Sequence, residues 1–224
     1  RGVVLVVALI PDKARVYPEY LGRYRRPAVL ADRYARTLQM LAAEGITAPD
    51  LLSPLLGATQ AGPVFLRTDT HWTPYGAEHV AKTIAKALPD GEQAFTTTTG
   101  SPIQHRGDLM KFLPLGWADA WLGPTPDSLI PTRTYLAGGT DLLGDTEIPL
   151  ALVGTSYSAN PDWNFAGFLQ QASGLDLINW AREGGGPFTP MEALLTEERF
   201  PNPPPRFIIW EIPERYLSVR EVIP

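Results

Sequence analysis

The chain has 224 residues, of which 44% are hydrophobic and 19% are charged, and its formal net charge is -5. This composition is typical of a globular α/β domain and excludes a disordered or collagen-like chain. The acidic balance and the lack of a long basic run argue against nucleic-acid binding, and the absence of cysteine excludes disulfides and a cysteine nucleophile.

Strand-like and helix-like patterns alternate along the chain. A Val-rich run at 3–10, ended by Pro11, predicts a strand buried on both faces of a parallel sheet. Apolar spacing predicts a helix over 31–43, and a short strand is expected at 64–67, followed by the loop 68–72. Thr73 and Pro74 then form a helix start, with Thr73 as the cap and Pro74 at the first helical position.

Residues 91–147 break this rhythm and predict a long irregular excursion with short helices and hairpins, of the kind that forms lids or substrate walls. Order returns with an expected strand at 149–153, a helix at 161–172, a strand at 175–180, a short helix at 191–197 and a last strand at 207–210. The alternation predicts a mainly parallel sheet with helices on both faces, in one domain over 1–224.

The sequence also bears on membranes and export. The longest apolar run, at 3–10, is far shorter than the ~20 residues of a membrane-spanning helix. The sequence begins at Arg1 without the zones of a signal peptide, so we expect a processed or trimmed chain whose anchor or export signal lies upstream.

Three loops are expected at the carboxyl ends of the strands, where α/β proteins place their active groups: 68–72, 154–158 and 183–186. Ser156 directly follows a strand and is the candidate nucleophile, His71 the candidate base, and Asp69 the group that orients the imidazole. The alternative is a helix-entry loop in which Asp69 caps and His71 bonds locally. No third ligand with suitable spacing accompanies this pair, so we predict neither a metal nor a cofactor. For His105, a structural or surface role is favoured over a place in the site.

Four motifs carry a resemblance to a known family. Residues 67–77 read RTDTHWTPYGA, residues 154–158 read GTSYS with WNF at 163–165, the start carries IPDK at 10–13 with YP at 17–18, and the end carries WEIPERY at 210–216. Together they resemble the bacterial alginate O-acetyltransferases, which are relatives of the SGNH hydrolases. The resemblance extends from about 3 to 217 and weakens across 91–147.

The resemblance implies an SGNH hydrolase-like three-layer sandwich that is circularly permuted, because Asp69 and His71 precede Ser156. It implies transfer of an acetyl group through a serine acyl-enzyme to hydroxyls of an exported polysaccharide such as alginate. It also implies a periplasmic protein, anchored through an upstream segment or free, that acts as a monomer or in a cell-envelope complex. The acetyl donor would come from a membrane-bound acyl-transfer partner.

The oxyanion and substrate groups are less defined. The backbone N–H of Ser156 is one expected oxyanion donor, and Gly184 or Gly185 a second. Further oxyanion or substrate-binding candidates are Arg215, Tyr216, Trp72, Thr155 and Tyr157. Arg215 can instead pair with Glu211 or Glu214 and brace the strand end. Sugar stacking is open to Trp72, Trp117, Trp121 and Trp163, although core packing explains at least half of them.

Two other functions fit the same residues. An acetyl esterase would use the same three groups with water as the acceptor. A non-catalytic polysaccharide-binding subunit of a secretion complex would not need Ser156 at all.

Overall fold

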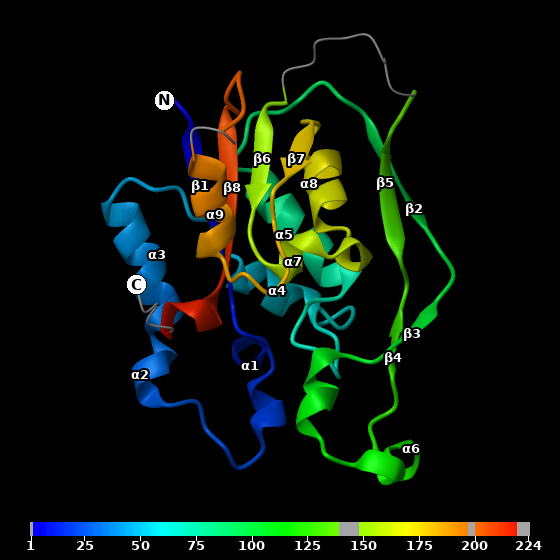
Figure 1. Ribbon diagram of the computed structural model, residues 1–224. Helices are drawn as coiled ribbons and strands as arrows, with labels where there is room; N and C mark the ends of the chain where they lie inside the picture. The colour runs from blue at the N-terminus through cyan, green and yellow to red at the C-terminus, as the bar shows by residue number, and fades with distance from the viewer. Residues whose placement is uncertain (1, 139–147, 197–199, 219–224) are drawn as a thin grey trace.

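A four-stranded parallel sheet forms the centre of the molecule (Figure 1). The computed structural model describes residues 2–138, 148–196 and 200–218. The strands are β1 (Val4–Ile10), β8 (Phe207–Pro213), β6 (Leu150–Val153) and β7 (Leu177–Asn179), in the order β1-β8-β6-β7. The run at 3–10, predicted as a strand buried on both faces, forms β1, which is buried from Val6 to Ile10 but has Val4 exposed at its start.

Helices cover both faces of the sheet. On one face lie α4 (Leu52–Ala58), α5 (Pro74–Ala85) and α8 (Phe165–Ser173), whose apolar side chains share one core cluster with β1 and β6. On the other face lie α3 (Arg33–Ala43) and α9 (Phe188–Leu195). The expected three-layer α/β sandwich with a parallel sheet is therefore confirmed.

The start of α5 fixes the loop that precedes it. The Thr73 side chain accepts a hydrogen bond from the backbone N–H of Gly76, as the sequence predicted, and Pro74 occupies the first helical position. The helix approaches the 64–67 segment so closely that a Cβ at Gly76 would lie 2.1 Å from the carbonyl oxygen of Val64. The loop 68–72 is thus held between a buried segment and a capped helix.

The expected strand at 64–67 is wrong. This segment forms only an isolated antiparallel bridge between Phe65 and Trp72, and it lies outside the central sheet. Its apolar side chains are buried in the core, while its backbone bonds across the loop: Leu66 N–H donates to the carbonyl of His71. An apolar run predicts that a segment is buried, but a buried segment need not pair with a neighbouring strand.

Other boundaries shift modestly. The helix expected over 161–172 begins only at Phe165, because a 3-10 turn at Pro161–Trp163 leads to Asn164 in the left-handed conformation (φ 51°). The last strand runs on through Glu211 to Pro213. The helix expected at 191–197 starts earlier, at Phe188, and residues 197–199 lie outside the described residues.

The segment expected as an excursion contains two antiparallel ribbons. β2 (Phe95–Thr99) pairs with β5 (Thr132–Leu136), and β3 (Ile103–His105) pairs with β4 (Asp127–Leu129). Between β3 and β4 lie two 3-10 turns and α6 (Asp119–Leu122). The β2–β5 ribbon runs beside α8 (Figure 1). Residues 139–147 of the expected excursion lie outside the described residues.

The remaining short elements flank the carboxyl end of the sheet. They are α1 (Lys13–Val16), a 3-10 turn at Pro18–Leu21, α2 (Ala28–Ala31), α7 (Ser156–Ala159) and a 3-10 turn at Glu214–Ser218. Within the described residues, none of the helices has the length and apolar character needed to cross a bilayer.

A buried ion cluster joins β8 to the segment after β1. The Glu214 side chain is fully buried, and Arg15 donates to both of its oxygens, at 2.9 and 2.5 Å. Arg33 adds a bond at 3.4 Å, and the backbone N–H of Asp12 another at 3.1 Å. A buried carboxylate is tolerated only when it is paired in this way.

We predict that Glu214→Ala lowers the free energy of unfolding by about 3–5 kcal/mol, because it removes a fully buried carboxylate and leaves the half-buried Arg15 without its counter-charge. Urea denaturation measures this. The control is Glu78→Ala, which removes a 2.6 Å ion pair with Lys82 on the solvent-facing side of α5 and should cost about 0.5 kcal/mol or less. Equal losses in the two variants would contradict the structural role of the cluster.

Candidate active site

The three residues singled out by their loops lie together at the carboxyl end of the sheet. β6 ends at Val153, and Ser156 follows as the first residue of α7. His71 Nε2 lies 2.7 Å from Ser156 Oγ, and His71 Nδ1 lies 2.5 Å from Asp69 Oδ1. The alternative in which Asp69 and His71 only complete a helix-entry loop does not account for the contact with Ser156, 85 residues away in the sequence.

The surroundings of Asp69 keep its carboxyl group ionised. The residue is only 4% exposed, which on its own would raise the pKa. Hydrogen bonds from His71 and His105 outweigh burial and hold the pKa of Asp69 well below its ordinary value. An ionised Asp69 can only accept, so it bonds the proton-bearing Nδ1 of His71 and leaves Nε2 to face the Ser156 hydroxyl. This is the tautomer that a general base needs.

Aromatic rings fix the plane of the His71 imidazole. Trp163 stacks on it with ring centres 5.4 Å apart and planes 21° apart, and Tyr157 contacts it at 4.7 Å. Trp163 also donates its indole N–H to the carbonyl of Ser156, at 3.2 Å. The same indole thereby aligns the histidine and the serine turn.

A second buried carboxylate, Glu211, bonds to the residues on both sides of Ser156 and so holds the serine turn. One of its oxygens accepts from the backbone N–H of Thr155 at 2.7 Å and from the Ser158 hydroxyl at 3.0 Å. A Cβ at Gly154 would lie 2.4 Å from this same oxygen, which explains the glycine. The bonds to neutral donors only partly offset burial, which raises the pKa of Glu211 to about 7.

The loop 68–72 is also held from the other side. Lys13 donates to the backbone carbonyls of Leu66, Arg67 and Asp69, at 2.5, 2.9 and 2.9 Å. Asp108, at the start of the first 3-10 turn after β3, accepts from the backbone N–H and the hydroxyl of Thr70, at 2.7 and 2.6 Å. The loop is therefore positioned by groups on both sides of it.

Asp108 also bears on metal binding. One donor atom each from Asp69, His71 and Asp108 lies within 4.8 Å of the others, so the structure supplies a third possible ligand that sequence spacing did not reveal. The donor atoms of Asp69 and His71, however, bond to each other at 2.5 Å. This arrangement suits a shared proton rather than an ion placed between them.

Several substrate candidates have other roles. Trp72 was a candidate for either sugar contact or core packing, and core packing is what the structure shows, because its side chain is fully buried and packs on Tyr157 and Phe165. Thr155 is also buried, and its hydroxyl bonds Glu211 and accepts from the Tyr157 N–H. It supports the turn instead of meeting a substrate. Trp163 is buried against the imidazole.

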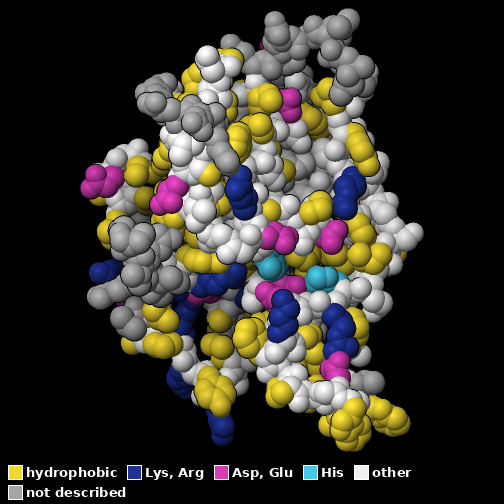
Figure 2. All heavy atoms as spheres, in the orientation of Figure 1, with side chains coloured by type: hydrophobic (Ala, Val, Ile, Leu, Met, Phe, Trp, Pro, Cys, Tyr) yellow, Lys and Arg dark blue, Asp and Glu magenta, His cyan; other side chains and the backbone are white. Residues whose placement is uncertain are grey.

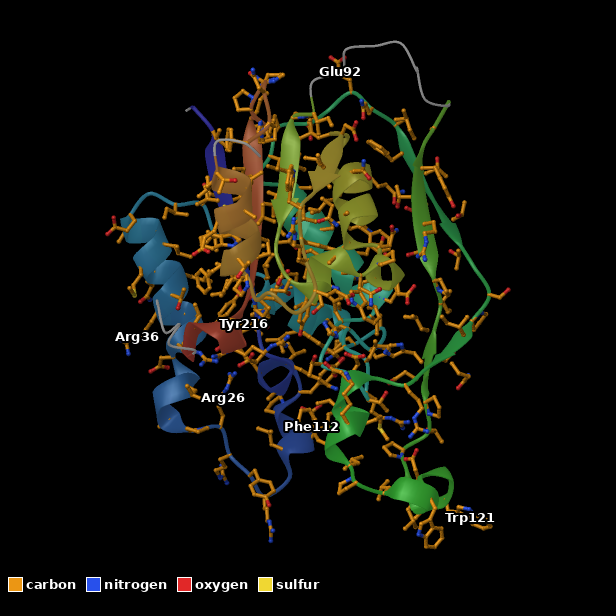
Figure 3. The ribbon with its side chains drawn as sticks, in the orientation of Figure 1. Arg26, Arg36, Glu92, Phe112, Trp121 and Tyr216 are labelled. Carbon is orange, nitrogen blue, oxygen red and sulfur yellow. The ribbon has the colours of Figure 1, made fainter. Side chains whose placement is uncertain are left out.

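Trp117 and Trp121 have the opposite environment. They are 91% and 85% exposed, and Figure 3 shows Trp121 on α6 at the far end of the molecule, pointing away from the sheet. Neither residue is packed in the core.

Arg215 and Tyr157 are joined beside the serine. The Arg215 guanidinium donates to the Tyr157 hydroxyl at 3.3 Å and lies 5.2 Å from the centre of its ring and 5.5 Å from that of Tyr216. The alternative ion pair of Arg215 is wrong: among the described residues it forms no ion pair with Glu211 or Glu214, which have the partners given above. Sequence patterns did not reveal the bond between Arg215 and Tyr157, because the two residues are 58 positions apart.

The glycine loop after β7 carries the two candidate oxyanion residues, Gly184 and Gly185. Gly184 is exposed with φ +76°, a conformation that favours glycine, and a Cβ at Gly185 would meet only Thr189. An oxyanion role for either residue stays a prediction.

A cationic cavity of about 580 Å³ adjoins the site. Thr70 and Tyr157, which neighbour His71 and Ser156 in the sequence, line one part of it. The rest combines basic and aromatic side chains, Lys13, Arg25, Arg26, Arg215, Tyr17 and Tyr20, with the aliphatic side chains of Ala14, Leu21, Pro27, Leu30 and Leu109. Its one acidic residue, Asp12, is paired with Arg26 at 3.1 Å. Figure 2 shows histidine side chains at the surface with both acidic and basic side chains beside them.

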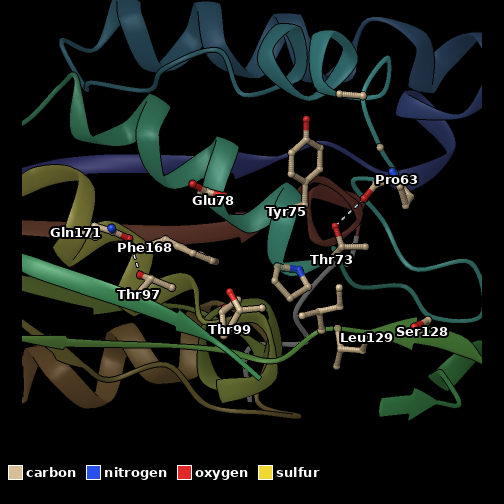
Figure 4. Close-up of a pocket in the computed structure, with 15 residues that line it drawn as sticks. Pro63, Thr73, Tyr75, Glu78, Thr97, Thr99, Ser128, Leu129, Phe168 and Gln171 are labelled. Carbon is tan, nitrogen blue, oxygen red and sulfur yellow. Dashed lines mark hydrogen bonds between the residues drawn. The ribbon is translucent and has the colours of Figure 1, made fainter. Parts of the chain in front are cut away.

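A second cavity, of about 520 Å³, lies between α5, α8 and the β2–β5 ribbon (Figure 4). Its polar lining is mostly hydroxyl groups, with Gln171 bonded to Thr97. None of the three site residues lines it.

The three-layer α/β domain presents a serine, a histidine and an aspartate at the carboxyl edge of its parallel sheet, an arrangement found in several classes of serine hydrolases and acyltransferases. The family model described as "SGNH hydrolase-like domain, acetyltransferase AlgX" matches residues 1–214, and the chain belongs to this family.

Named relatives agree with this assignment. The probable alginate O-acetylase AlgJ of Pseudomonas aeruginosa is 48% identical over 98% of this chain and 60% of its own length. The solved O-acetyltransferase domain of Pseudomonas putida AlgJ is 44% identical, with a TM-score of 0.90 over 99% of this chain and 78% of that one. The Pseudomonas aeruginosa AlgX structure is 31% identical, with a TM-score of 0.75 over 95% and 52%. The chain thus spans about three fifths of the length of the AlgJ relative.

We predict that the pH dependence of stability reports Glu211. Its folded pKa of about 7 exceeds its ordinary value of 4.5, so its contribution is greatest below pH 4.5 and is lost as the pH rises through 7. Between pH 4.5 and 8, wild type should lose of the order of 3 kcal/mol relative to Glu211→Gln, which stays neutral. Denaturation of both proteins across this range measures the difference, with Glu192→Gln on the exposed face of α9 as control. A constant difference would show that Glu211 does not titrate in this range.

Proposed function

We propose that this chain is the catalytic domain of an O-acetyltransferase that acetylates hydroxyls of an acidic exported polysaccharide of the alginate type. The observation that carries the proposal is the His71 imidazole, bonded to Ser156 Oγ at 2.7 Å and to Asp69 Oδ1 at 2.5 Å. Membership of the AlgX-type family and the names of the AlgJ relatives support the choice of acetyl as the transferred group and of alginate as the type of polymer.

The proposed first half-reaction forms an acetyl-enzyme. Ser156 Oγ attacks the carbonyl carbon of an acetyl donor while His71 Nε2 takes the hydroxyl proton, and Asp69 stabilises the imidazolium. The tetrahedral intermediate collapses, the donor's leaving group departs with the proton from His71, and the acetyl group stays on Ser156. In the second half, His71 takes the proton of a sugar hydroxyl, which attacks the acetyl carbon, and Ser156 regains its proton.

The negative oxygen of each intermediate needs donors. We assign the backbone N–H of Ser156 and that of Gly184 or Gly185 to this role, and each such donor typically contributes about 3–4 kcal/mol in the transition state. Arg215, with Tyr216 beside it, faces the cationic cavity and is assigned to the acceptor polymer.

The cationic cavity supports an acidic acceptor. Four basic side chains line it together with Thr70 and Tyr157, the sequence neighbours of His71 and Ser156, although the whole chain has a net charge of -5. A polymer with one carboxylate per sugar would find charge partners here, and Tyr17 and Tyr20 offer rings for sugar faces. An acceptor held in place of water distinguishes transfer from hydrolysis by an esterase.

The same relatives support a proposed cellular setting. We propose a periplasmic location, with the acetyl donor supplied by a membrane-bound acyl-transfer partner and the domain working in a cell-envelope complex. These statements rest on the relatives' place in alginate biosynthesis.

We expect Ser156→Ala to reduce acetyl transfer from a chromogenic acetyl ester to an oligouronate by at least about a thousandfold, since the nucleophile is lost. Mass spectrometry of the acetylated oligosaccharide measures transfer. Ser53→Ala, on the exposed start of α4, serves as the matched control. Acetate release without acetylated sugar would indicate an esterase, and full activity in cells carrying Ser156→Ala would indicate a non-catalytic binding subunit.

A charge test addresses the acceptor. Arg25→Ala should raise KM for the oligouronate several-fold and leave KM for the small acetyl ester unchanged, because only the polymer needs the cavity's charge. Arg36→Ala, on the outer side of α3 (Figure 3), removes the same charge away from the cavity. A similar increase for both variants would mean that overall charge, and not this cavity, attracts the polymer.

A further inference from the structure

The Asp69 carboxylate has a second imidazole partner. His105 Nε2 lies 2.7 Å from Asp69 Oδ2, while Asp69 Oδ1 bonds His71. His105 is the last residue of β3, in the segment between 91 and 147. The sequence pattern favoured a structural or surface role for it, whereas its ring nitrogen in fact meets the buried group that orients the candidate base.

The direction of this hydrogen bond follows from the charge of Asp69. An ionised carboxylate can only accept, so His105 donates through Nε2–H. The other donor to Oδ2, the backbone N–H of Asp108, is 3.3 Å away and therefore weaker. Because Asp69 is buried, water is poorly placed to substitute. His105 thus supplies the main bond that sets the rotation of the carboxylate.

The backbone around His105 is fitted closely to the loop that carries Asp69. Gly107 donates its N–H to the Thr68 hydroxyl at 3.0 Å, and Leu109 donates to the Thr68 carbonyl at 3.1 Å. A Cβ at Gly107 would lie 2.2 Å from that carbonyl oxygen. The register between the two segments is therefore fixed, and with it the distance from His105 to Asp69.

His105 also packs against an aromatic ring. Its imidazole meets Trp163 edge-on, with centres 5.5 Å apart and planes at 82°, and Trp163 in turn stacks on His71. Removing His105 would alter both packing and hydrogen bonding, so a test has to separate the two.

We propose that His105 is a positioning residue for acyl transfer: its Nε2–H bond turns Asp69 so that Oδ1 meets His71 Nδ1. This proposal rests on the proposed function. It adds His105, at the end of β3, to the residues that position the active site. His105 does not touch the substrate; it acts through Asp69 on the basicity and orientation of His71.

Three variants separate donation from packing. His105→Gln keeps an N–H at the Nε2 position without the ring, His105→Phe keeps the ring without the donor, and His105→Ala removes both. We expect His105→Phe and His105→Ala to lower kcat for a chromogenic acetyl ester by about 10- to 100-fold, as for loss of a hydrogen bond to a charged group. KM should be unchanged, and His105→Gln should keep kcat within about threefold of wild type.

The opposite order would overturn the proposal: wild-type kcat in His105→Phe with loss in His105→Gln means that the ring only packs. Equal kcat in all four proteins also contradicts it. If His105→Phe does not fold, a kcat in His105→Gln no better than in His105→Ala overturns the proposal equally. The control is His79→Gln, which replaces a histidine that packs on Tyr75 in α5. Ester cleavage that survives Ser156→Ala would instead remove the proposed function itself.

Discussion

A negative charge buried at the carboxyl end of the sheet is the constraint on which the site depends. Removing a carboxylate from water is costly unless hydrogen bonds replace the lost solvation. For Asp69 these bonds come from its own loop, through the N–H and ring of His71, and from the β3 segment, through His105 and Asp108. The capped start of α5 and the Lys13 bonds hold the loop itself. Much of the surrounding structure therefore keeps the Asp69 carboxylate ionised and in one orientation.

The two buried carboxylates near Ser156 illustrate how donors decide ionisation. Asp69 and Glu211 are both almost inaccessible, yet the pKa of Asp69 is lowered and that of Glu211 is raised. Asp69 receives bonds from two imidazoles, which can carry positive charge, whereas Glu211 receives bonds from an amide and two hydroxyls. Asp69 can thus stabilise an imidazolium, while Glu211 is suited to bracing the serine turn in a neutral or charged state.

Local patterns were enough to predict the parallel sheet, and the resemblance of four motifs to a known family was needed as well to single out Ser156, His71 and Asp69. Consecutive apolar residues predict a buried strand, and two adjacent residues, Thr73 and Pro74, predict the start of a helix. Features decided by distant contacts were missed. The sequence left Trp72 open between sugar contact and the core that it fills, and the partners of Glu214 and Asp69 lie 199 and 36 residues away in the sequence. A run such as 64–67 shows burial without showing whether a neighbouring strand exists.

Peptide mass spectrometry after brief exposure to a reactive acetyl ester tests the central claim most directly. The account predicts one acetyl group on the peptide that contains Ser156, with little or none in a His71→Ala protein that retains its fold. An acetyl group on another serine, or equal labelling of Ser156 without His71, would contradict it.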